Sequence, residues 1–350
     1  MTATGPGRAV WALSLLGVVL ASPGHGQGLR EVRVALSFPN GPVFPYYSVA
    51  EELGYFAQEG VKAVLVTTPG SGAAYKAMAS GQTDVAHAQP AQVLNGLALG
   101  EDVVAWYVLY QGHVFQFVTT ADSPVRRVAD LKGAKVGVSS VAGGQYAYLI
   151  ATLEGAGLTV GPGKDVEVAE IGRGGAAGIA LRERRVAAYS ASFVDMLVIR
   201  QQGIELRELK EGPSASFFSD VLVARRATLK EPRVAVGLPR AIAKATVFCF
   251  ENQEACWRII AKHVPDTARR PEFTRPLLAE TLVLHRLPAE ARGQWGFHRA
   301  DAWQAVHDYL VRSGQLAKPV EVSRAFTNEY IAAINQFDVA AVKAEAKAFR

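Results

Sequence analysis

The chain has 350 residues, of which 49% are hydrophobic and 20% are charged. This composition excludes a disordered or low-complexity protein, and the length predicts two domains rather than one core. The net charge is only +5, and the densest basic group, at Arg182, Arg184 and Arg185, is interrupted by Glu183, so without a basic stripe we expect no nucleic-acid partner.

Residues 1–26 have the parts of a secretory signal peptide. Arg8 supplies a positive charge, an apolar run follows at 9–21, and Ser22 to Gln27 break the helix and offer small residues for cleavage. The apolar run is shorter than the ~20 residues that a membrane-spanning helix needs. No cysteine follows it, so no lipid anchor is expected there. The sequence therefore predicts a soluble protein exported to the periplasm.

From residue 31, apolar strand patterns alternate with amphipathic helix patterns, which is typical of a mostly parallel sheet covered on both faces. A helix with one apolar stripe is predicted at 45–56. Further helices are predicted from residue 71 and at 90–99. Strands are predicted at 32–36, 61–66 and 84–88, followed by β-rich runs at 103–110 and 114–119.

A second series of strands and helices begins after a change of composition at 121–124 and ends near Gly212 and Pro213. Its predicted elements are strands at 135–139, 165–170, 186–189 and 204–206 and helices after Gly143, at 176–184 and at 193–201. A strand at 217–224 and a helical tail complete the chain. We therefore expect one lobe from 27–120 plus 213–350, a second lobe from 121–212, and crossing strands near 114–120 and 217–224.

The only two cysteines are Cys249 and Cys256. In one continuous helix they would lie about 10 Å apart at ~1.5 Å per residue, which is beyond the reach of a disulfide. Asn252 has the character of a helix N-cap that divides the segment, and a turn there could bring the sulfurs together in an oxidising compartment. A disulfide and two buried free thiols both remain open. No metal site is expected, because no other ligands accompany the pair.

Five segments carry a family resemblance, at 50–60, 77–85, 129–138, 251–255 and 326–331. They resemble the solute-binding proteins of ABC importers, in the group of the nitrate, sulfonate and taurine binders and the thiamine-pyrimidine (NMT1/THI5-like) binders. The resemblance implies a type II periplasmic-binding-protein fold, in which two α/β lobes joined by two crossing strands close on a solute, with a helical C-terminal tail on the first lobe. It also implies a small-molecule solute and a membrane permease as partners, and we expect a monomer.

Some fungal relatives of this group synthesise the thiamine pyrimidine and carry a cysteine-rich motif, which this chain lacks. The chain also lacks a Gly-x-Ser-x-Gly elbow, a His-Glu-x-x-His pair and a phosphate loop. We therefore expect a binding protein with no catalytic residues and no cofactor. The alternatives are a pyrimidine-synthase-like enzyme on the same fold and a sensing module that serves a receptor kinase.

The candidate ligand site lies where predicted strands end and helices begin, because helix N-termini present unpaired N–H groups. Gln89 and Gln145 suit an amide-like or heterocyclic edge, Arg173 could clamp a sulfonate or carboxylate, and aromatic residues could wall a planar solute. His87 has two interpretations, a ligand contact or a structural residue. The candidate ligand-binding residues are Phe44, Tyr46, Ser71, Gly72, His87, Gln89, Ser139, Ser140, Gly144, Gln145, Arg173, Ser192 and Phe193. The expected solute is a sulfonate, a pyrimidine or a similar planar or anionic molecule.

Overall fold

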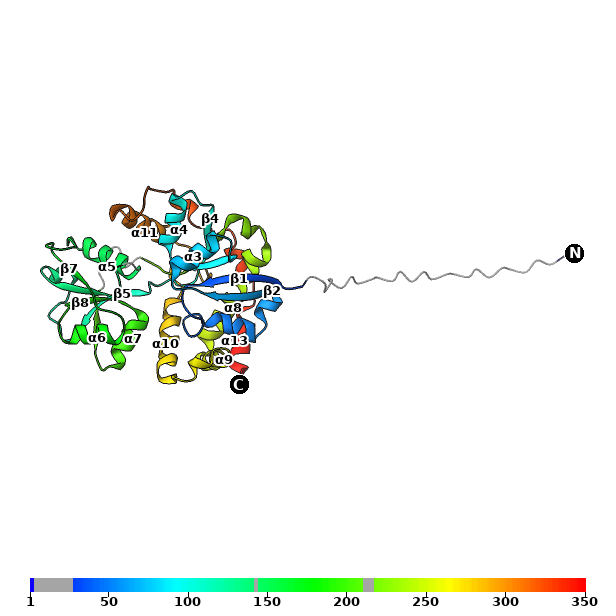
Figure 1. Ribbon diagram of the computed structural model, residues 1–350. Coiled ribbons are helices and arrows are strands. Elements are labelled where there is room, and N and C mark those ends of the chain that lie inside the picture. The colour runs from blue at the N-terminus through cyan, green and yellow to red at the C-terminus, as the bar shows by residue number, and fades with distance from the viewer. Residues whose placement is uncertain (3–27, 142–143, 210–216) are drawn as a thin grey trace.

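The computed structural model describes residues 1–2, 28–141, 144–209 and 217–350, so the predicted signal peptide lies almost entirely outside the described residues. The chain forms two lobes, each built on a five-stranded sheet with helices on its faces (Figure 1). In this described part of the chain, no helix is long and apolar enough to cross a membrane. The two-lobed α/β architecture predicted from the sequence is confirmed.

The sheet of the first lobe has the strand order β2-β1-β3-β10-β4. The first three strands run parallel, and β10 is antiparallel to both of its neighbours. Residues of β1 alternate between two clusters of side chains, with Val34 packed on one face and Ala35 on the other. Both faces are covered, which explains why the strands read as nearly continuous apolar runs. The strands are β1 (Arg30–Leu36), β2 (Val61–Thr67), β3 (Val85–Ala88), β4 (Val103–Val108) and β10 (Val221–Arg225).

The predicted helix at 45–56 is two helices in the structure, α1 (Pro45–Glu52) and α2 (Tyr55–Gln58). Gly54 lies between them with φ at +68°, a left-handed conformation that ends a helix and that glycine adopts without strain. The two other helices of this part of the lobe, α3 (Ser71–Ala79) and α4 (Pro90–Ala98), begin close to their predicted positions.

The sheet of the second lobe has the order β7-β6-β8-β5-β9. Its strand β5 is antiparallel to β8, with Phe117 opposite Ser190. The sheet therefore includes residues that the sequence-based boundary at 120 assigned to the first lobe. The elements of this lobe are β5 (Phe115–Thr120), β6 (Lys135–Val138), β7 (Glu167–Glu170), β8 (Ala188–Ser192), β9 (Leu206–Glu208), the 3₁₀ turn η1 (Val128–Leu131), α5 (Gly144–Gly155), α6 (Gly175–Arg182) and α7 (Phe193–Gln201).

Two connectors join the lobes: residues 109–114, and the segment between β9 and β10, of which residues 209 and 217–220 are described. They lie side by side: the N–H groups of Leu109 and Tyr110 donate to the Asp220 carbonyl at 2.8 and 3.1 Å, and the Ser219 N–H donates to the Tyr110 carbonyl at 3.2 Å. The strands predicted to cross between the lobes, near 114–120 and 217–224, correspond to β5 and β10. Each of them belongs to one sheet, so the chain crosses in the residues just before these strands.

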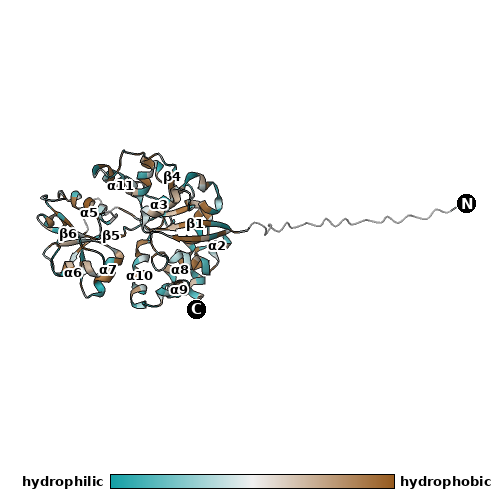
Figure 2. Ribbon diagram, in the orientation of Figure 1, coloured by the Kyte–Doolittle hydropathy of each residue, from teal (hydrophilic) through white to brown (hydrophobic). Residues whose placement is uncertain are grey.

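The chain after β10 is mostly helical and packs on the first lobe, as predicted (Figure 1). The Phe326 segment adds a short bridge beside β4 through Ala105, and Tyr55 Oη donates to Glu345 of the last helix at 2.6 Å. In Figure 2 the apolar residues concentrate in the strands and the inner helix faces. The elements are η3 (Arg226–Lys230), the π-helical turn η4 (Arg233–Gly237), α8 (Leu238–Glu251), α9 (Gln253–His263), η5 (Pro265–Thr267), α10 (Pro271–Leu284), η6 (Ala289–Ala291), α11 (Ala300–Arg312), η7 (Val322–Arg324), α12 (Ile331–Ile334) and α13 (Val339–Ala348).

The open question of the cysteines is settled by a helix break. Asn252 separates α8 from α9, and its side chain accepts a hydrogen bond from the Ala255 N–H at 2.9 Å, which caps the second helix. The turn brings the Cα atoms of Cys249 and Cys256 to 5.0 Å, and the two residues form a disulfide.

Candidate functional site

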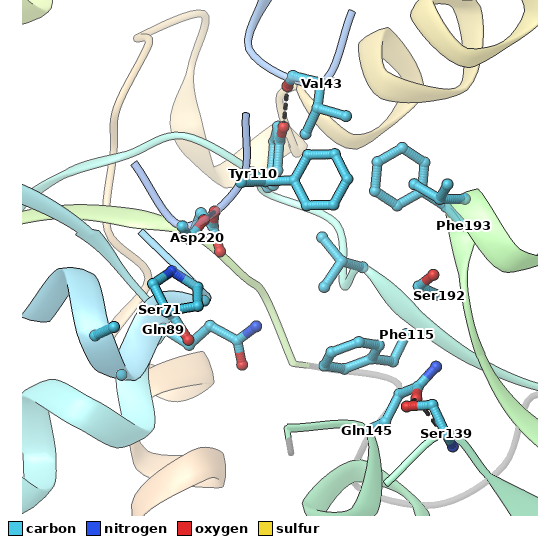
Figure 3. Close-up of a pocket in the computed structure, with 18 of the residues that line it drawn as sticks. Val43, Ser71, Gln89, Tyr110, Phe115, Ser139, Gln145, Ser192, Phe193 and Asp220 are labelled. Carbon is cyan, nitrogen blue, oxygen red and sulfur yellow. Dashed lines mark hydrogen bonds between the residues drawn. The ribbon is translucent and has the colours of Figure 1, made fainter. Parts of the chain in front are cut away.

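A cavity of about 450 Å³ lies between the lobes (Figure 3). Its walls come from both lobes and from both connectors, as expected for the carboxyl-terminal edges of two facing sheets. Nine of the thirteen candidate ligand-binding residues line it: Phe44, Ser71, Gly72, Gln89, Ser139, Gln145, Arg173, Ser192 and Phe193. The structure thus brings most of the predicted site together, and contact with a ligand stays a prediction.

Several helices begin at this cavity, because each follows directly from a strand end or its loop. Ser71 and Gly72 open α3, Gln89 precedes α4, and Ser192 and Phe193 start α7. The first turn of a helix presents N–H groups and a partial positive charge. The cavity therefore offers backbone donors from both lobes.

Aromatic rings form the apolar part of the wall. Phe44 and Tyr110 come from the first lobe and its connector, with their ring centroids 6.3 Å apart and nearly parallel. Phe115 and Phe193 come from the second lobe, together with Phe38 from the first. In the view of Figure 3, Tyr110 and Phe193 lie above the cavity, and Phe115 lies below it beside Gln145. Opposed rings and amide groups suit a flat solute with polar edges.

Asp220 is the main functional candidate that the sequence analysis missed. Its side chain lines the cavity, is only 5% exposed, and accepts a hydrogen bond from Ser37 Oγ at 3.0 Å. The sequence did contain a signal for it, an acidic residue inside the apolar run 217–224. A carboxylate buried in such a run needs hydrogen-bond partners, which a bound solute can supply. The Tyr110 hydroxyl lies nearby and donates to the Val43 carbonyl. Burial, and to a lesser extent the negative charge of Asp220, raises the pKa of this hydroxyl.

His87 is placed behind the cavity wall, so the structure favours the structural interpretation. It is fully buried, its ring lies 4.5 Å from that of Phe44, and its Nε2 is 2.8 Å from Tyr47 Oη. Its Nδ1 lies 3.9 Å from the Asp220 carboxylate. Burial lowers the pKa of His87, an effect partly offset by Asp220. All four residues of β3 are buried, so the His87 ring packs behind Phe44 and Asp220 and does not reach the cavity.

Tyr46 also lies outside the cavity lining. It is the second residue of α1, fully buried, and its ring packs edge-on against His285 at 5.5 Å. Phe44 precedes the helix and lines the cavity, whereas Tyr46 lies inside the first turn and faces the core. Ser140 is half-buried and is not among the lining residues, while Gly144 is the first residue of α5.

The second-lobe wall is organised by Asp195, which sequence reasoning did not single out. This residue is 3% exposed. Its carboxylate accepts hydrogen bonds from Gln145 Nε2 at 3.0 Å, the Gly174 N–H at 3.0 Å and Ser192 Oγ at 2.7 Å. Arg173 Nε lies 3.5 Å from the same carboxylate, with its side chain 60% exposed. The Arg173 charge at the cavity is therefore already balanced by Asp195.

Charge is scarce in the cavity. Among the described lining residues, only Arg173 and Asp220 carry charged side chains. They have opposite signs, and since Arg173 is paired with Asp195, the Asp220 carboxylate is the negative charge that a solute would meet. Within the same described part of the chain, no cluster of three acidic, histidine or cysteine side chains could hold a metal ion.

Comparison with known proteins gives a consistent result for the fold. A family model described as NMT1/THI5 like matches residues 41–256. The riboflavin-binding protein RibY of Chloroflexus aurantiacus is 25% identical over 325 residues, which cover 89% of this chain and 88% of that protein.

Two solved structures show the same architecture at low identity. The periplasmic aliphatic sulphonate binding protein SsuA of Escherichia coli has a TM-score of 0.64 at 19% identity, covering 84% of this chain and 91% of that chain. The periplasmic nitrate-binding protein NrtA of Synechocystis PCC 6803 has a TM-score of 0.60 at 13% identity, covering 92% and 99%. Both are binding proteins, and the resemblance stated from the sequence is confirmed. The family model matches more than half of the chain, so this chain belongs to the NMT1/THI5-like family, and it has the two-lobed fold of these periplasmic binding proteins.

Proposed function

We propose that this protein is the exported, periplasmic solute-binding component of an ABC importer. As a monomer, it would capture a small organic solute between its lobes and deliver it to a membrane permease. The cavity supports this proposal because both lobes contribute to it while only two connectors join them. A solute that touches both lobes favours the closed arrangement by its difference in affinity for the two states.

We propose further that the solute is a planar nitrogen heterocycle, with flavins the first class to test. The observation that carries this proposal is the pairing of aromatic walls with polar edges made of amide and hydroxyl groups and one carboxylate. Phe44, Tyr110, Phe115 and Phe193 supply flat apolar surface, and the amides can donate and accept at a ring edge. The cavity volume of about 450 Å³ lies within the ~300–1,000 Å³ usual for such ligands.

The buried Asp220 carboxylate disfavours an inorganic anion or a simple sulfonate. An anion held about 5 Å from this carboxylate would be repelled by roughly 3 kcal/mol at an effective dielectric constant near 20. Arg173 offsets this only weakly, since its charge is already balanced by Asp195. A ring N–H or hydroxyl donor, in contrast, gains a hydrogen bond to a charged acceptor. The riboflavin-binding relative RibY agrees with this assignment more closely than the sulphonate-binding and nitrate-binding proteins do.

The test is a set of titrations of purified residues 27–350 with riboflavin, a pyrimidine, an alkanesulfonate and nitrate, by isothermal calorimetry. We expect a heterocycle to bind most tightly, and scattering curves to show a more compact protein when it is bound. The isosteric Asp220→Asn change should weaken that binding about 10-fold or more, because a hydrogen bond to a charged group contributes ~1.5–3 kcal/mol.

The matched control is Asp122→Asn, which removes a carboxylate that is 77% exposed and remote from the cavity lining. It should leave every affinity unchanged. Tightest binding of nitrate or of the alkanesulfonate, with Asp220→Asn having no effect, would overturn the assignment of the solute class. Turnover of any of these compounds into product would overturn the assignment as a binding protein.

A further inference from the structure

A second pocket of about 220 Å³, here called the rear pocket, adjoins the cavity on the other side of the start of α4. Gln89 and Gln92 line both spaces. The opposite boundary is Phe115, which lines the main cavity and whose ring lies 5.4 Å from His113 and 6.4 Å from Tyr148, two residues of the rear pocket. The two spaces are thus neighbours, separated by side chains of the two lobes.

The rear pocket also lies between the lobes. Its first-lobe wall consists of the first turns of α4 and of residues from α11, such as Leu310. Tyr148 of α5 belongs to the second lobe, while His113 and Phe217 belong to the two connectors. A group held there would therefore contact both lobes, as the proposed solute does in the main cavity.

The lining of the rear pocket is polar and uncharged. The hydrogen bonds of Asn95 and Gln315 use their amide nitrogens, toward the Ala91 carbonyl at 3.0 Å and Tyr309 Oη at 2.7 Å. Their carbonyl oxygens can therefore accept from hydroxyl groups. Among the described lining residues none is acidic, lysine or arginine, and burial lowers the pKa of His113 to about 4, which keeps its ring neutral near pH 7.

The polar groups stand next to ring faces. His113 stacks on Tyr148 with centroids 4.5 Å apart, and Phe217 meets the His113 ring edge-on at 5.9 Å. Carbonyl acceptors facing aromatic surface suit a chain that alternates hydroxyl groups with C–H bonds. They do not suit a phosphate or a carboxylate, which would need a cation.

We propose that the rear pocket is a second subsite of the same binding site, which takes a short, neutral, hydroxyl-rich chain attached to the planar head group in the main cavity. This inference rests on the proposed function. The chain would pass between Gln89 and Phe115, and its hydroxyls would donate to Asn95 and Gln315. Occupation of both spaces by one molecule would add contacts across the lobes and favour closure.

The experiment compares two probes with the same ring system, riboflavin, which carries a ribityl chain, and lumiflavin, which carries a methyl group in its place. Two or three hydrogen bonds at ~1 kcal/mol each predict that riboflavin binds at least about 10-fold more tightly. Asn95→Leu removes an acceptor and Ala91→Leu fills the pocket. Either change should reduce the preference for riboflavin to about 3-fold or less while leaving the lumiflavin affinity unchanged.

The matched control is Gln304→Leu, an exposed position of α11 outside both linings, which should keep the full preference. The melting temperature of each empty variant shows whether it is folded, and the two rear-pocket changes act at different positions, so one failure to fold leaves the other informative. Equal binding of both flavins by the native protein, or equal weakening of both by the variants, would overturn the subsite and leave the proposed function standing. Binding of neither flavin would overturn the proposed solute and the subsite with it.

Discussion

Replacing Asp195 with alanine tests whether one buried carboxylate holds the second-lobe wall of the cavity. The residue is 3% exposed and accepts three hydrogen bonds of 2.7–3.0 Å, from Gln145, Gly174 and Ser192. Alanine leaves these donors without their charged acceptor in a buried place. Removing one partner from such a buried charged arrangement costs about 3–5 kcal/mol, so we expect the free energy of unfolding to fall by that amount.

The assay is urea unfolding followed by far-UV circular dichroism, together with amide hydrogen exchange of segment 172–202. The midpoint should shift to lower urea, and the amides of Gly174 and Ser192 should exchange faster. Asp195→Asn should be nearly as destabilising, since both carboxylate oxygens accept hydrogen bonds and an amide NH₂ would face a donor.

The control for this prediction is Asp122→Ala, whose carboxylate is 77% exposed and lies 3.9 Å from Arg184. An exposed pair of this kind contributes about 0–1 kcal/mol, so the midpoint should barely move. If Asp195→Ala matched this control in both midpoint and exchange, the assignment of Asp195 as the organiser of the wall would be wrong.

Three further predictions concern the rest of the molecule. The double change Cys249→Ser and Cys256→Ser should lower the free energy of unfolding by roughly 2 kcal/mol, because the disulfide closes a loop with a sequence separation of 7. A reductant should lower the stability of the native protein by the same amount and leave that of the double variant unchanged. Lowering the pH from about 6.5 toward 4 should destabilise the protein in part through His113, since the unfolded chain takes up a proton that the buried ring, with its pKa lowered to about 4, does not. His285 and His298 are buried with lowered pKa values as well, so His113→Gln should make this pH dependence of the urea midpoint shallower without removing it, and an unchanged slope would contradict the reasoning. Gly296→Ala should lower the free energy of unfolding by more than ~2 kcal/mol, because a Cβ there would lie 2.2 Å from the Tyr107 ring at a φ of +85°; a variant as stable as the native protein would show that the ring can move away.

Much of the fold was accessible from local patterns. Helix starts at Ser71, Pro90 and Phe193 follow turn and capping residues, and α7 has the predicted bounds. Asn252 could be recognised as a helix-capping residue, so a break in the helix was foreseeable and the sequence analysis could not exclude the disulfide. The lobe boundary was harder, because strand β5 pairs with β8 some 70 residues later, and pairing between distant segments leaves no local trace.

Residues following strand ends were predictable as cavity residues because the carboxyl edge of a sheet gathers them whatever the details of packing. Gln89 and Ser192 are examples. The orientation of His87 was not predictable, since a strand covered by helices on both faces can turn that ring toward either. Asp220 reaches the same corner from a connector 133 positions further along the chain, and its carboxylate meets Ser37 and His87 only once the two crossings lie side by side. The sequence by itself determined which segments would form the edges of the cavity. Only the tertiary structure decided which side chains face into it and which charges balance there, because those depend on contacts between segments distant in the chain that no local pattern records.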